Sequence, residues 1–148
     1  MRNRVVNKLL VTAAASALLL TGCGSAVVEL SKSDCLELPD GALATGVFEL
    51  ENLTTVACTA PHNAEVVDTL RLPDGPFPGT EKLMEEATAF CPQAFSEYIG
   101  KDPKDSILDL APLSPTKESW ERAKDRTIIC LAFSQHEKIS GTFKNSRR

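Results

Sequence analysis

The 148-residue chain lacks the sequence signatures of the common hydrolases and nucleotide-binding proteins. It contains neither a Gly-x-Ser-x-Gly segment, which forms the nucleophile elbow of many hydrolases, nor a phosphate-binding glycine loop. Its only histidines are His62 and His136. Its cysteines are expected to pair as disulfides, which leaves no thiolate for nucleophilic attack. These absences predict that the protein is not an enzyme.

The sequence also lacks an excess of basic residues. The chain has 16 Lys and Arg against 20 Asp and Glu, and residues 1–22 carry three of the basic residues and none of the acids. Residues 23–148 therefore carry 13 basic and 20 acidic side chains, a net charge of −7. This charge argues against binding to nucleic acid or to anionic lipid headgroups, because both need clustered Lys and Arg. The short basic stretch of residues 145–148 is expected to be a solvated tail.

No apolar run in the sequence is long enough to span a membrane. The longest, Leu9–Leu20, has about 12 residues, whereas a membrane-spanning helix needs about 20. Three basic residues, Arg2, Arg4 and Lys8, precede this run without an acid to offset them. A basic start followed by a short apolar core is typical of a secretory signal peptide, which we place at residues 1–22.

The predicted signal peptide ends in Leu20-Thr21-Gly22-Cys23, a run that resembles the bacterial lipobox. By this resemblance, Cys23 becomes the first residue of the mature protein and is lipid-modified. One acyl chain holds a protein only marginally at a membrane, whereas two or more anchor it stably. The resemblance implies a lipoprotein on the outer face of the cell membrane, with residues 23–33 as a short tether.

Four cysteines are left when Cys23 is set aside: Cys35, Cys58, Cys91 and Cys130. An even set in an exported chain indicates disulfides, and four cysteines allow three pairings. We favour the sequential pairing, Cys35–Cys58 and Cys91–Cys130, in which each bond contributes roughly 3 to 4 kcal/mol by the loop-closure estimate. No close Cys-x-x-Cys spacing is present, so no metal site is expected.

Residues 34–144 are long enough for one domain with its own core. Within them, Arg126–Phe133 is the most apolar run and is expected at the centre of a sheet, with Ile139–Phe143 at an edge. Six segments have the composition of strands: Val47–Leu50, Thr54–Cys58, Glu65–Leu72, Ile107–Leu113, Arg126–Phe133 and Ile139–Phe143.

A long helix is predicted from Thr80, as its N-cap, to about Tyr98, because apolar side chains recur there at helical spacing. Gly100 is a natural stop for it. A second helix of one or two turns, Lys117–Lys124, follows Thr116 as its cap. The predicted fold class is therefore α+β: a small antiparallel or mixed sheet with one long packed helix and two disulfides.

A first candidate site lies at His62 and Glu65. These side chains are able to form an acid–base pair or to supply two ligands of a metal ion. In the other interpretation, Pro61 shapes a turn after a disulfide and His62 hydrogen-bonds to the backbone of that turn. We favour the structural interpretation, because two ligands without a third make a poor metal site.

A second candidate site lies at Trp120, Asp125 and Arg126. An exposed Trp beside an Arg is a typical contact hot spot. The other interpretation places Trp120 in the core and pairs Asp125 with Arg126 as a local ion pair. We favour this second interpretation, because a single Trp in a small domain is usually part of the core.

In its cysteines, its Pro-His-x-x-Glu turn and its Trp and Asp-Arg segments, the chain resembles the actinobacterial septum formation domain. The resemblance spans about Asp34 to Phe143, nearly the whole predicted mature chain. The segments that carry it are Asp34-Cys35, Val56–Val66, Leu72–Gly79, Cys91–Phe95, Tyr98–Gly100, Pro115-Thr116, Trp120 and Asp125–Leu131.

The resemblance implies an extracytoplasmic domain behind a membrane anchor, with a link to cell division, and it supplies no catalytic residues. This chain departs from the family at Lys124, where members usually have a glycine before Asp125 and Arg126. A glycine there would end the short helix in a left-handed conformation. A lysine must adopt that conformation at a cost or use a different turn.

The leading hypothesis is a non-catalytic binding or scaffold domain, anchored through Cys23 and linked to septum formation or cell-wall assembly. Its expected partners are the membrane and cell-envelope or division proteins, with no cofactor and no nucleic acid. Two alternatives stay open: a metal-dependent or acid–base enzyme module built on His62 and Glu65, and a small-molecule-binding lipoprotein. The residues predicted for a binding surface are His62, Glu65, Trp120, Asp125 and Arg126.

Overall fold

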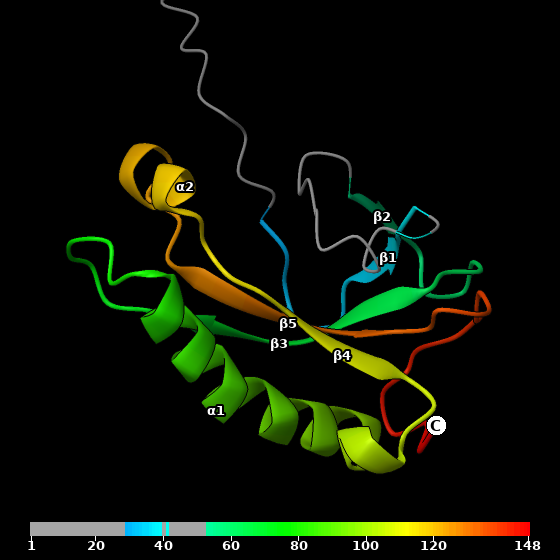
Figure 1. Cartoon of the computed structure of the whole chain (residues 1–148). Coiled ribbons are helices and arrows are strands. Elements are labelled where there is room, and N and C mark those ends of the chain that lie inside the picture. The colour runs from blue at the N-terminus through cyan, green and yellow to red at the C-terminus, as the bar shows by residue number, and fades with distance from the viewer. Residues whose placement is uncertain (1–28, 40, 42–52) are drawn as a thin grey trace, which may run out of the picture.

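A computed structural model describes residues 29–39, 41 and 53–148. The predicted signal peptide, the predicted lipidation site Cys23, the first part of the tether and the predicted strand Val47–Leu50 lie outside the described residues. The described residues form a five-stranded antiparallel sheet with one long helix against one face (Figure 1). This arrangement confirms the predicted α+β class and shows that the sheet is antiparallel.

The strands run in the order β2-β1-β3-β5-β4 across the sheet, and every neighbouring pair is antiparallel. Three of the strands lie in the first half of the chain: β1 Cys35–Glu37, β2 Thr54–Val56 and β3 Ala64–Arg71. The other two are β4 Asp109–Leu113 and β5 Thr127–Phe133. The short strand β1, which pairs with both β2 and β3, was not predicted from the sequence.

Strand β5 is buried on both faces, as its apolar run predicted. The side chains of Ile128, Cys130 and Ala132 belong to the core under the long helix, and those of Ile129, Leu131 and Phe133 belong to the core on the opposite face. Full burial of an Ile, Leu or Phe side chain contributes about 1.5–3 kcal/mol. Successive side chains of a strand point to opposite faces of the sheet. Because both faces are covered at this position, the whole run has to be apolar.

The long helix α1, Thr80–Ile99, packs its apolar stripe on the sheet (Figure 1). Thr80 is not the N-cap as predicted but the first helical residue, since the cap position is Gly79, with φ 96° and no side-chain cap. Gly100 ends the helix with φ 79°, as predicted, in the left-handed region that glycine adopts without strain.

The short helix α2, Lys117–Arg122, begins after the predicted cap Thr116. The Thr116 side chain accepts a hydrogen bond from the Ser119 N–H, and the Ser119 hydroxyl accepts one from the Thr116 N–H. This reciprocal pair satisfies two backbone donors of the first turn. A single 3-10 turn, η2 Pro103–Asp105, lies between α1 and β4.

Both disulfides follow the predicted pairing. Cys91–Cys130 joins α1 to β5 across a sequence separation of 39, and both of its residues are fully buried. Cys35–Cys58 joins β1 to the residues after β2 across a separation of 23. Each bond limits the conformational freedom of the unfolded chain, and loops of these lengths give roughly 3 to 4 kcal/mol per bond.

The chain after β5 does not form the predicted edge strand Ile139–Phe143. Ile139 makes an isolated bridge to His62, and Gly141, with φ 94°, turns the chain inward. Phe143 is then fully buried in the core beside α1. The turn wins over strand pairing because it brings a backbone N–H to a buried carboxylate, that of Glu65.

The last described residues then cover the end of α1. The N–H of Asn145 donates to the carbonyl of Tyr98 (2.8 Å), and the N–H of Arg147 donates to the carbonyl of Ile99 (2.9 Å). These carbonyls have no partner within the helix, so the C-terminal segment supplies the missing donors. Figure 1 shows the C-terminus beside this end of α1.

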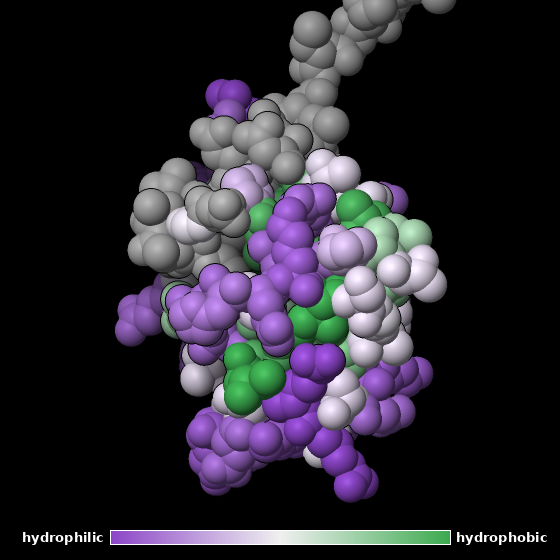
Figure 2. Space-filling model, turned by 90° about the vertical axis from the view of Figure 1, so that its right-hand side faces the viewer, coloured by the Kyte–Doolittle hydropathy of each residue, from purple (hydrophilic) through white to green (hydrophobic). Residues whose placement is uncertain are grey.

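The surface is mixed rather than broadly apolar. Figure 2 shows the side at the right of Figure 1 as largely hydrophilic, with hydrophobic side chains in small separate groups. Among the described residues, the exposed large hydrophobic side chains are Met84 and Ile107. None of the helices in the described part of the chain is long and apolar enough to cross a membrane.

Candidate functional site

The five side chains predicted as a binding surface fall into two separate groups. His62 and Glu65 lie in a fully buried cluster next to the Cys35–Cys58 disulfide. Trp120, Asp125 and Arg126 lie at the corner between α2 and β5.

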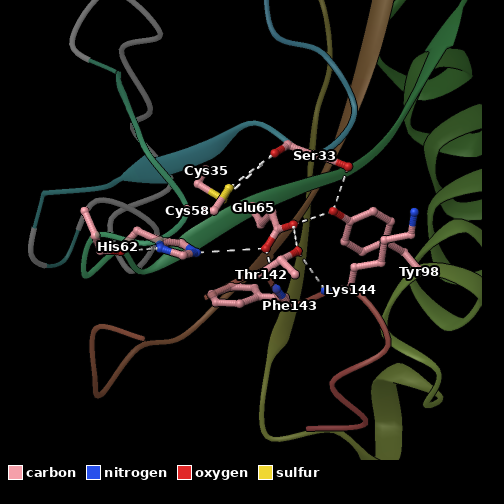
Figure 3. The surroundings of a disulfide bond; sticks show 10 residues. Ser33, Cys35, Cys58, His62, Glu65, Tyr98, Thr142, Phe143 and Lys144 are labelled. Carbon is pink, nitrogen blue, oxygen red and sulfur yellow. Dashed lines mark hydrogen bonds and ion pairs between the residues drawn. A yellow bond between two sulfur atoms is a disulfide. The ribbon is translucent and has the colours of Figure 1, made fainter. Parts of the chain in front are cut away.

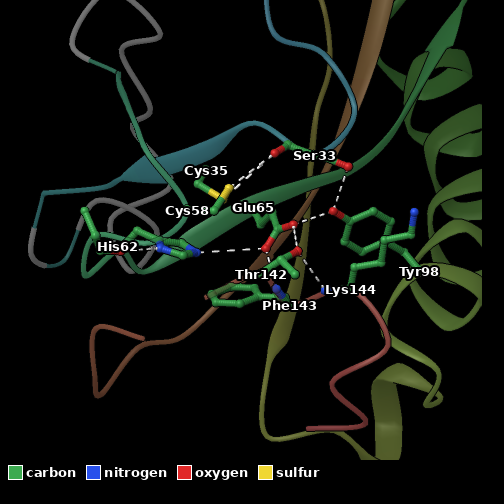
Figure 4. A network of polar contacts seen from close by, with 10 residues as sticks. Ser33, Cys35, Cys58, His62, Glu65, Tyr98, Thr142, Phe143 and Lys144 are labelled. Carbon is green, nitrogen blue, oxygen red and sulfur yellow. Dashed lines mark hydrogen bonds and ion pairs between the residues drawn. A yellow bond between two sulfur atoms is a disulfide. The ribbon is translucent and has the colours of Figure 1, made fainter. Parts of the chain in front are cut away.

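The centre of the buried cluster is the carboxylate of Glu65, on β3. Its Oε1 accepts hydrogen bonds from the hydroxyls of Tyr98 and Thr142, the latter at 2.6 Å. Its Oε2 accepts one from the backbone N–H of Phe143 at 2.5 Å. Figure 4 shows the donors converging on the carboxylate from α1 and from the C-terminal segment. A buried carboxylate is tolerated only with such partners.

Burial of the Tyr98 hydroxyl raises its pKa above the ordinary value, because the phenolate would be poorly solvated there. The hydrogen bond to Glu65 raises that pKa further, since it requires the proton to stay on the phenol. The Ser33 hydroxyl lies 2.9 Å from the Tyr98 oxygen. Since the phenol proton is given to Glu65, Ser33 is the donor in this contact, and it partly offsets the rise of the Tyr98 pKa. The cluster thus holds a neutral phenol next to a carboxylate.

His62 lies at the edge of this cluster, one residue after Pro61. Its Nδ1 is 2.9 Å from the carbonyl of Ala60, which only accepts hydrogen bonds, so we assign the proton to Nδ1. Its ring stacks on Phe143 with centroids 4.9 Å apart. The predicted hydrogen bond between His62 and the turn backbone is therefore present.

The other ring nitrogen of His62 points into the cluster. Nε2 is 3.9 Å from Oε2 of Glu65 and has no hydrogen-bond partner among the described residues. Both side chains are 0% exposed. The pair that the sequence predicted is thus in contact, but neither group reaches the surface of the described structure.

Cys35 is the neighbour that sequence reasoning missed. Its Sγ, a ring nitrogen of His62 and a carboxylate oxygen of Glu65 all lie within 4.8 Å of one another. Figure 3 shows the disulfide beside both side chains. The proximity follows from the pairing of Cys35 with Glu65 between β1 and β3, which a sequence without a predicted β1 does not reveal. In the disulfide this sulfur is not a thiolate and is not available as a metal ligand.

At the second group, Trp120 is buried, as the structural interpretation expected. Its Nε1 donates to the carbonyl of Gly75 at 2.8 Å. The guanidinium of Arg126 stacks on the indole, with Cζ 4.0 Å from the ring centroid. This arrangement is a cation–π contact between two largely desolvated groups.

Contrary to the prediction, Arg126 does not form an ion pair with the Asp125 carboxylate. Its Nε is 3.2 Å from Oδ1 of Asp74, and its Nη1 donates to the carbonyls of Trp120 and Asp125. The Asp125 carboxylate instead accepts from the Ser119 hydroxyl and from the backbone N–H of Thr127. Neighbouring side chains before a strand point in different directions, so Asp74, from the loop before α1, reaches the arginine.

Lys124 takes the left-handed conformation that its family position suggested, with φ 58°. For a residue with a Cβ this conformation costs about 1–2 kcal/mol. The turn is still formed because Ser119 O accepts from the N–H groups of Ala123 and Asp125.

A groove of about 370 Å³ opens next to this corner, on the face of the sheet opposite α1. Its apolar lining includes Leu30, Leu113 and Ile129, and its polar lining includes Arg71, Lys124 and Arg126. The volume is within the range of ligand pockets. Four separate segments of the chain meet here, so no local sequence pattern predicted the groove.

Two of the cationic side chains that line the groove have no ion-pair partner among the described residues. Arg71 and Lys124 are exposed, whereas Arg126 is already paired with Asp74. Of the acidic residues in the lining, Asp125 is committed to internal hydrogen bonds and Glu29 is exposed. The groove therefore has a locally positive rim on an acidic domain.

Comparison with protein families matches residues 25–130 to the family described as septum formation. The matched range includes the two disulfides, the Glu65 strand and the Trp120 corner. Comparison with curated proteins finds no match, and neither does comparison with solved structures.

Proposed function

The chain belongs to the septum formation family, and we propose from this that it is an extracytoplasmic lipoprotein with a non-catalytic binding domain that acts in septum formation or cell-wall assembly. The observation that carries the proposal is the groove with a positive rim next to the start of the described chain. The lipid anchor at Cys23 places this groove at the membrane, and the family points to the division site.

The short tether supports a fixed position of the groove. Glu29 and Leu30 line it, and Leu30 is packed in the core. Glu29 is six residues from Cys23, and six residues span at most about 20 Å when fully extended. A partner that meets the groove would therefore lie close to the membrane surface.

The burial and internal hydrogen bonding of His62 and Glu65 support a non-catalytic role. A general acid or base has to come within hydrogen-bond reach of its substrate. Glu65 and His62 are fully buried, and three donors of the chain itself occupy the Glu65 carboxylate. Turnover of a cell-wall substrate by the purified protein, lost in His62→Ala, would contradict this role.

The charge of the groove favours an acidic segment of an envelope or division protein as the partner. Arg71 and Lys124 offer charge to an acidic side chain, and Leu113 and Ile129 offer an apolar floor to its neighbour. Interfaces of this kind combine a small apolar centre with a polar rim.

The test is the position of the protein in dividing cells, followed with a fluorescent domain joined after Arg148 by a flexible linker. We expect enrichment at the septum, loss of membrane attachment in Cys23→Ser, and loss of enrichment but not of attachment in Arg71→Glu. Lys104→Glu is the matched control, because Lys104 is an exposed lysine that does not line the groove. Uniform envelope staining of the wild-type protein would overturn the septal role.

A small-molecule ligand is the second candidate for the same groove, because its volume lies near the lower end of the range for ligand pockets. Native mass spectrometry of the protein extracted from membranes distinguishes the two. A bound mass of a few hundred daltons, lost in Arg71→Glu, would favour a small molecule. Cross-linking to a protein through the groove would favour the acidic segment.

A further inference from the structure

The structure also contains a site that the groove does not explain: the buried cluster beside the half-buried Cys35–Cys58 disulfide. We propose that reduction of this disulfide converts the cluster into a Zn²⁺ site with Cys35, Cys58, His62 and Glu65 as its ligands. The site is independent of the proposed function, since no member of it lines the groove.

The first support is geometric. The ligand atoms of Cys35, His62 and Glu65 all lie within 4.8 Å of one another. In a tetrahedral zinc site with bonds of about 2.0–2.3 Å, ligand atoms are about 3.3–3.8 Å apart. The atoms need to approach by roughly an ångström, and we expect side-chain rotation to bring them together while the strand pairing stays as it is.

The second support is the orientation of His62. A histidine that binds a metal commonly donates its other ring N–H to a backbone carbonyl, which fixes the tautomer and the ring. His62 makes that contact through Nδ1 with the carbonyl of Ala60, and Nε2 faces the cluster without a hydrogen-bond partner among the described residues. The nitrogen lone pair then faces a carboxylate oxygen at 3.9 Å. A cation between them would satisfy both.

The third support is the spare capacity of Glu65. Its Oε1 accepts two hydrogen bonds, whereas Oε2 accepts one, from the N–H of Phe143, and Oε2 is the atom that faces His62. Hydrogen bonds to a ligating carboxylate hold it in place for the metal. Tyr98, Thr142 and Phe143 would provide this support without leaving their present positions.

The redox step needs a reductant, which we take to be a protein dithiol. Its two thiols are oxidised to a disulfide while the Cys35–Cys58 bond breaks, and two electrons and two protons pass to the cysteine sulfurs. Zn²⁺ then binds both sulfurs as thiolates, and the two thiol protons are released to solvent. Cys58 is half-buried and accessible to the reductant, whereas Cys91 and Cys130 are fully buried.

The experiment uses the full chain in detergent, with and without a phosphine reductant, titrated with Zn²⁺ alone against a chromogenic chelator. Mass mapping of alkylated cysteines identifies which disulfide has opened. We expect no Zn²⁺ binding by the oxidised protein and one Zn²⁺ per chain after selective reduction of Cys35–Cys58. His62→Ala should weaken binding by more than about 100-fold, because even loss of a supporting residue costs 10–100-fold.

His136→Ala is the matched control, because His136 is the other histidine and is exposed, and its Zn²⁺ affinity should equal that of the wild type. Co²⁺ in the reduced wild-type protein should give the absorption of a tetrahedral site with thiolate ligands, a readout that needs no variant to fold. The proposal is wrong if the reduced protein binds no Zn²⁺ or if His62→Ala binds it as tightly. It is equally wrong if reduction unfolds the chain and Zn²⁺ does not restore Trp120 fluorescence.

Discussion

The Glu65 cluster and the Trp120–Arg126 corner each bury a charged side chain, but they satisfy it differently. Glu65, on β3, is fully buried and accepts hydrogen bonds from α1 and from the C-terminal segment. Arg126 is 5% exposed, yet its ion-pair partner Asp74 is 81% exposed. The first region is closed by the chain itself, and the second opens on a groove.

The difference shows that a buried charge does not by itself mark a functional site. In the closed region the buried charge fixes which segments come together, and its removal affects folding. In the open region the charge is held at a surface where a partner can meet it. Four predictions test this distinction, beginning with the largest expected effect.

Glu65→Ala should lower the free energy of unfolding by about 3–5 kcal/mol. The change leaves the buried Tyr98 hydroxyl and the buried Phe143 N–H without their acceptor, and loss of one member of a buried polar set has this magnitude. Urea unfolding followed by Trp120 fluorescence measures it. Glu85→Ala on the exposed side of α1 is the control and should stay within about 0.5 kcal/mol of the wild type. Equal effects of the two changes would remove the distinction between closed and open regions.

Arg126→Lys should cost about 2 kcal/mol. A lysine keeps the charge but not the planar fork that donates to the carbonyls of Trp120 and Asp125. Arg122→Lys is the matched control, because Arg122 makes an exposed ion pair with Glu118 and should cost less than about 0.5 kcal/mol. If both variants unfold at the same urea concentration, the contacts of Arg126 contribute little.

The titration of Tyr98 reports on the closed cluster alone, because Tyr98 is the single tyrosine in the chain. Burial and the hydrogen bond to Glu65 raise its pKa above the ordinary value of about 10. The folded protein then keeps a proton that the unfolded chain loses, so stability should fall as the pH rises above about 10.

Ultraviolet absorbance of the phenolate gives the Tyr98 pKa directly, and Tyr98→Phe should remove its part of the fall in stability. A titration midpoint at or below the ordinary pKa would show that the cluster is open to water.

Lys124→Gly should raise the free energy of unfolding by about 0.5–1 kcal/mol. Glycine relieves the strain at φ 58°, and part of the gain is offset by its greater freedom in the unfolded chain. Lys117→Gly, within α2, should have the opposite sign and cost up to about 1 kcal/mol. A destabilised Lys124→Gly would mean that the lysine side chain supports the corner by its packing.

The main elements of the fold were predictable because their patterns are local. The long helix, predicted from Thr80 to about Tyr98, is observed over Thr80–Ile99. The strand predicted within Arg126–Phe133 is observed over Thr127–Phe133, as an interior strand beside the middle strand β3. The predicted sequential disulfide pairing is also confirmed. Periodicity and cysteine count express these features directly in the sequence.

What the sequence did not reveal depends on distant contacts. The three-residue strand β1 has no periodicity to detect and exists because β2 and β3 flank it. Asp74 was not expected as the partner of Arg126, since 52 positions separate them. The segment Ile139–Phe143 has strand composition, yet the need of Glu65 for a donor overrides it.

The donors that Glu65 receives from the C-terminal segment have a consequence for the order in which the chain folds. Glu65 is separated from Thr142 and Phe143 by 77 and 78 positions, so a shortened chain that contains the whole sheet still lacks both groups. Contacts this distant in sequence form late, because the loop between them must first be closed. We therefore expect residues 29–138 alone to be protease-sensitive, and resistance to appear only in a chain that extends through residue 147.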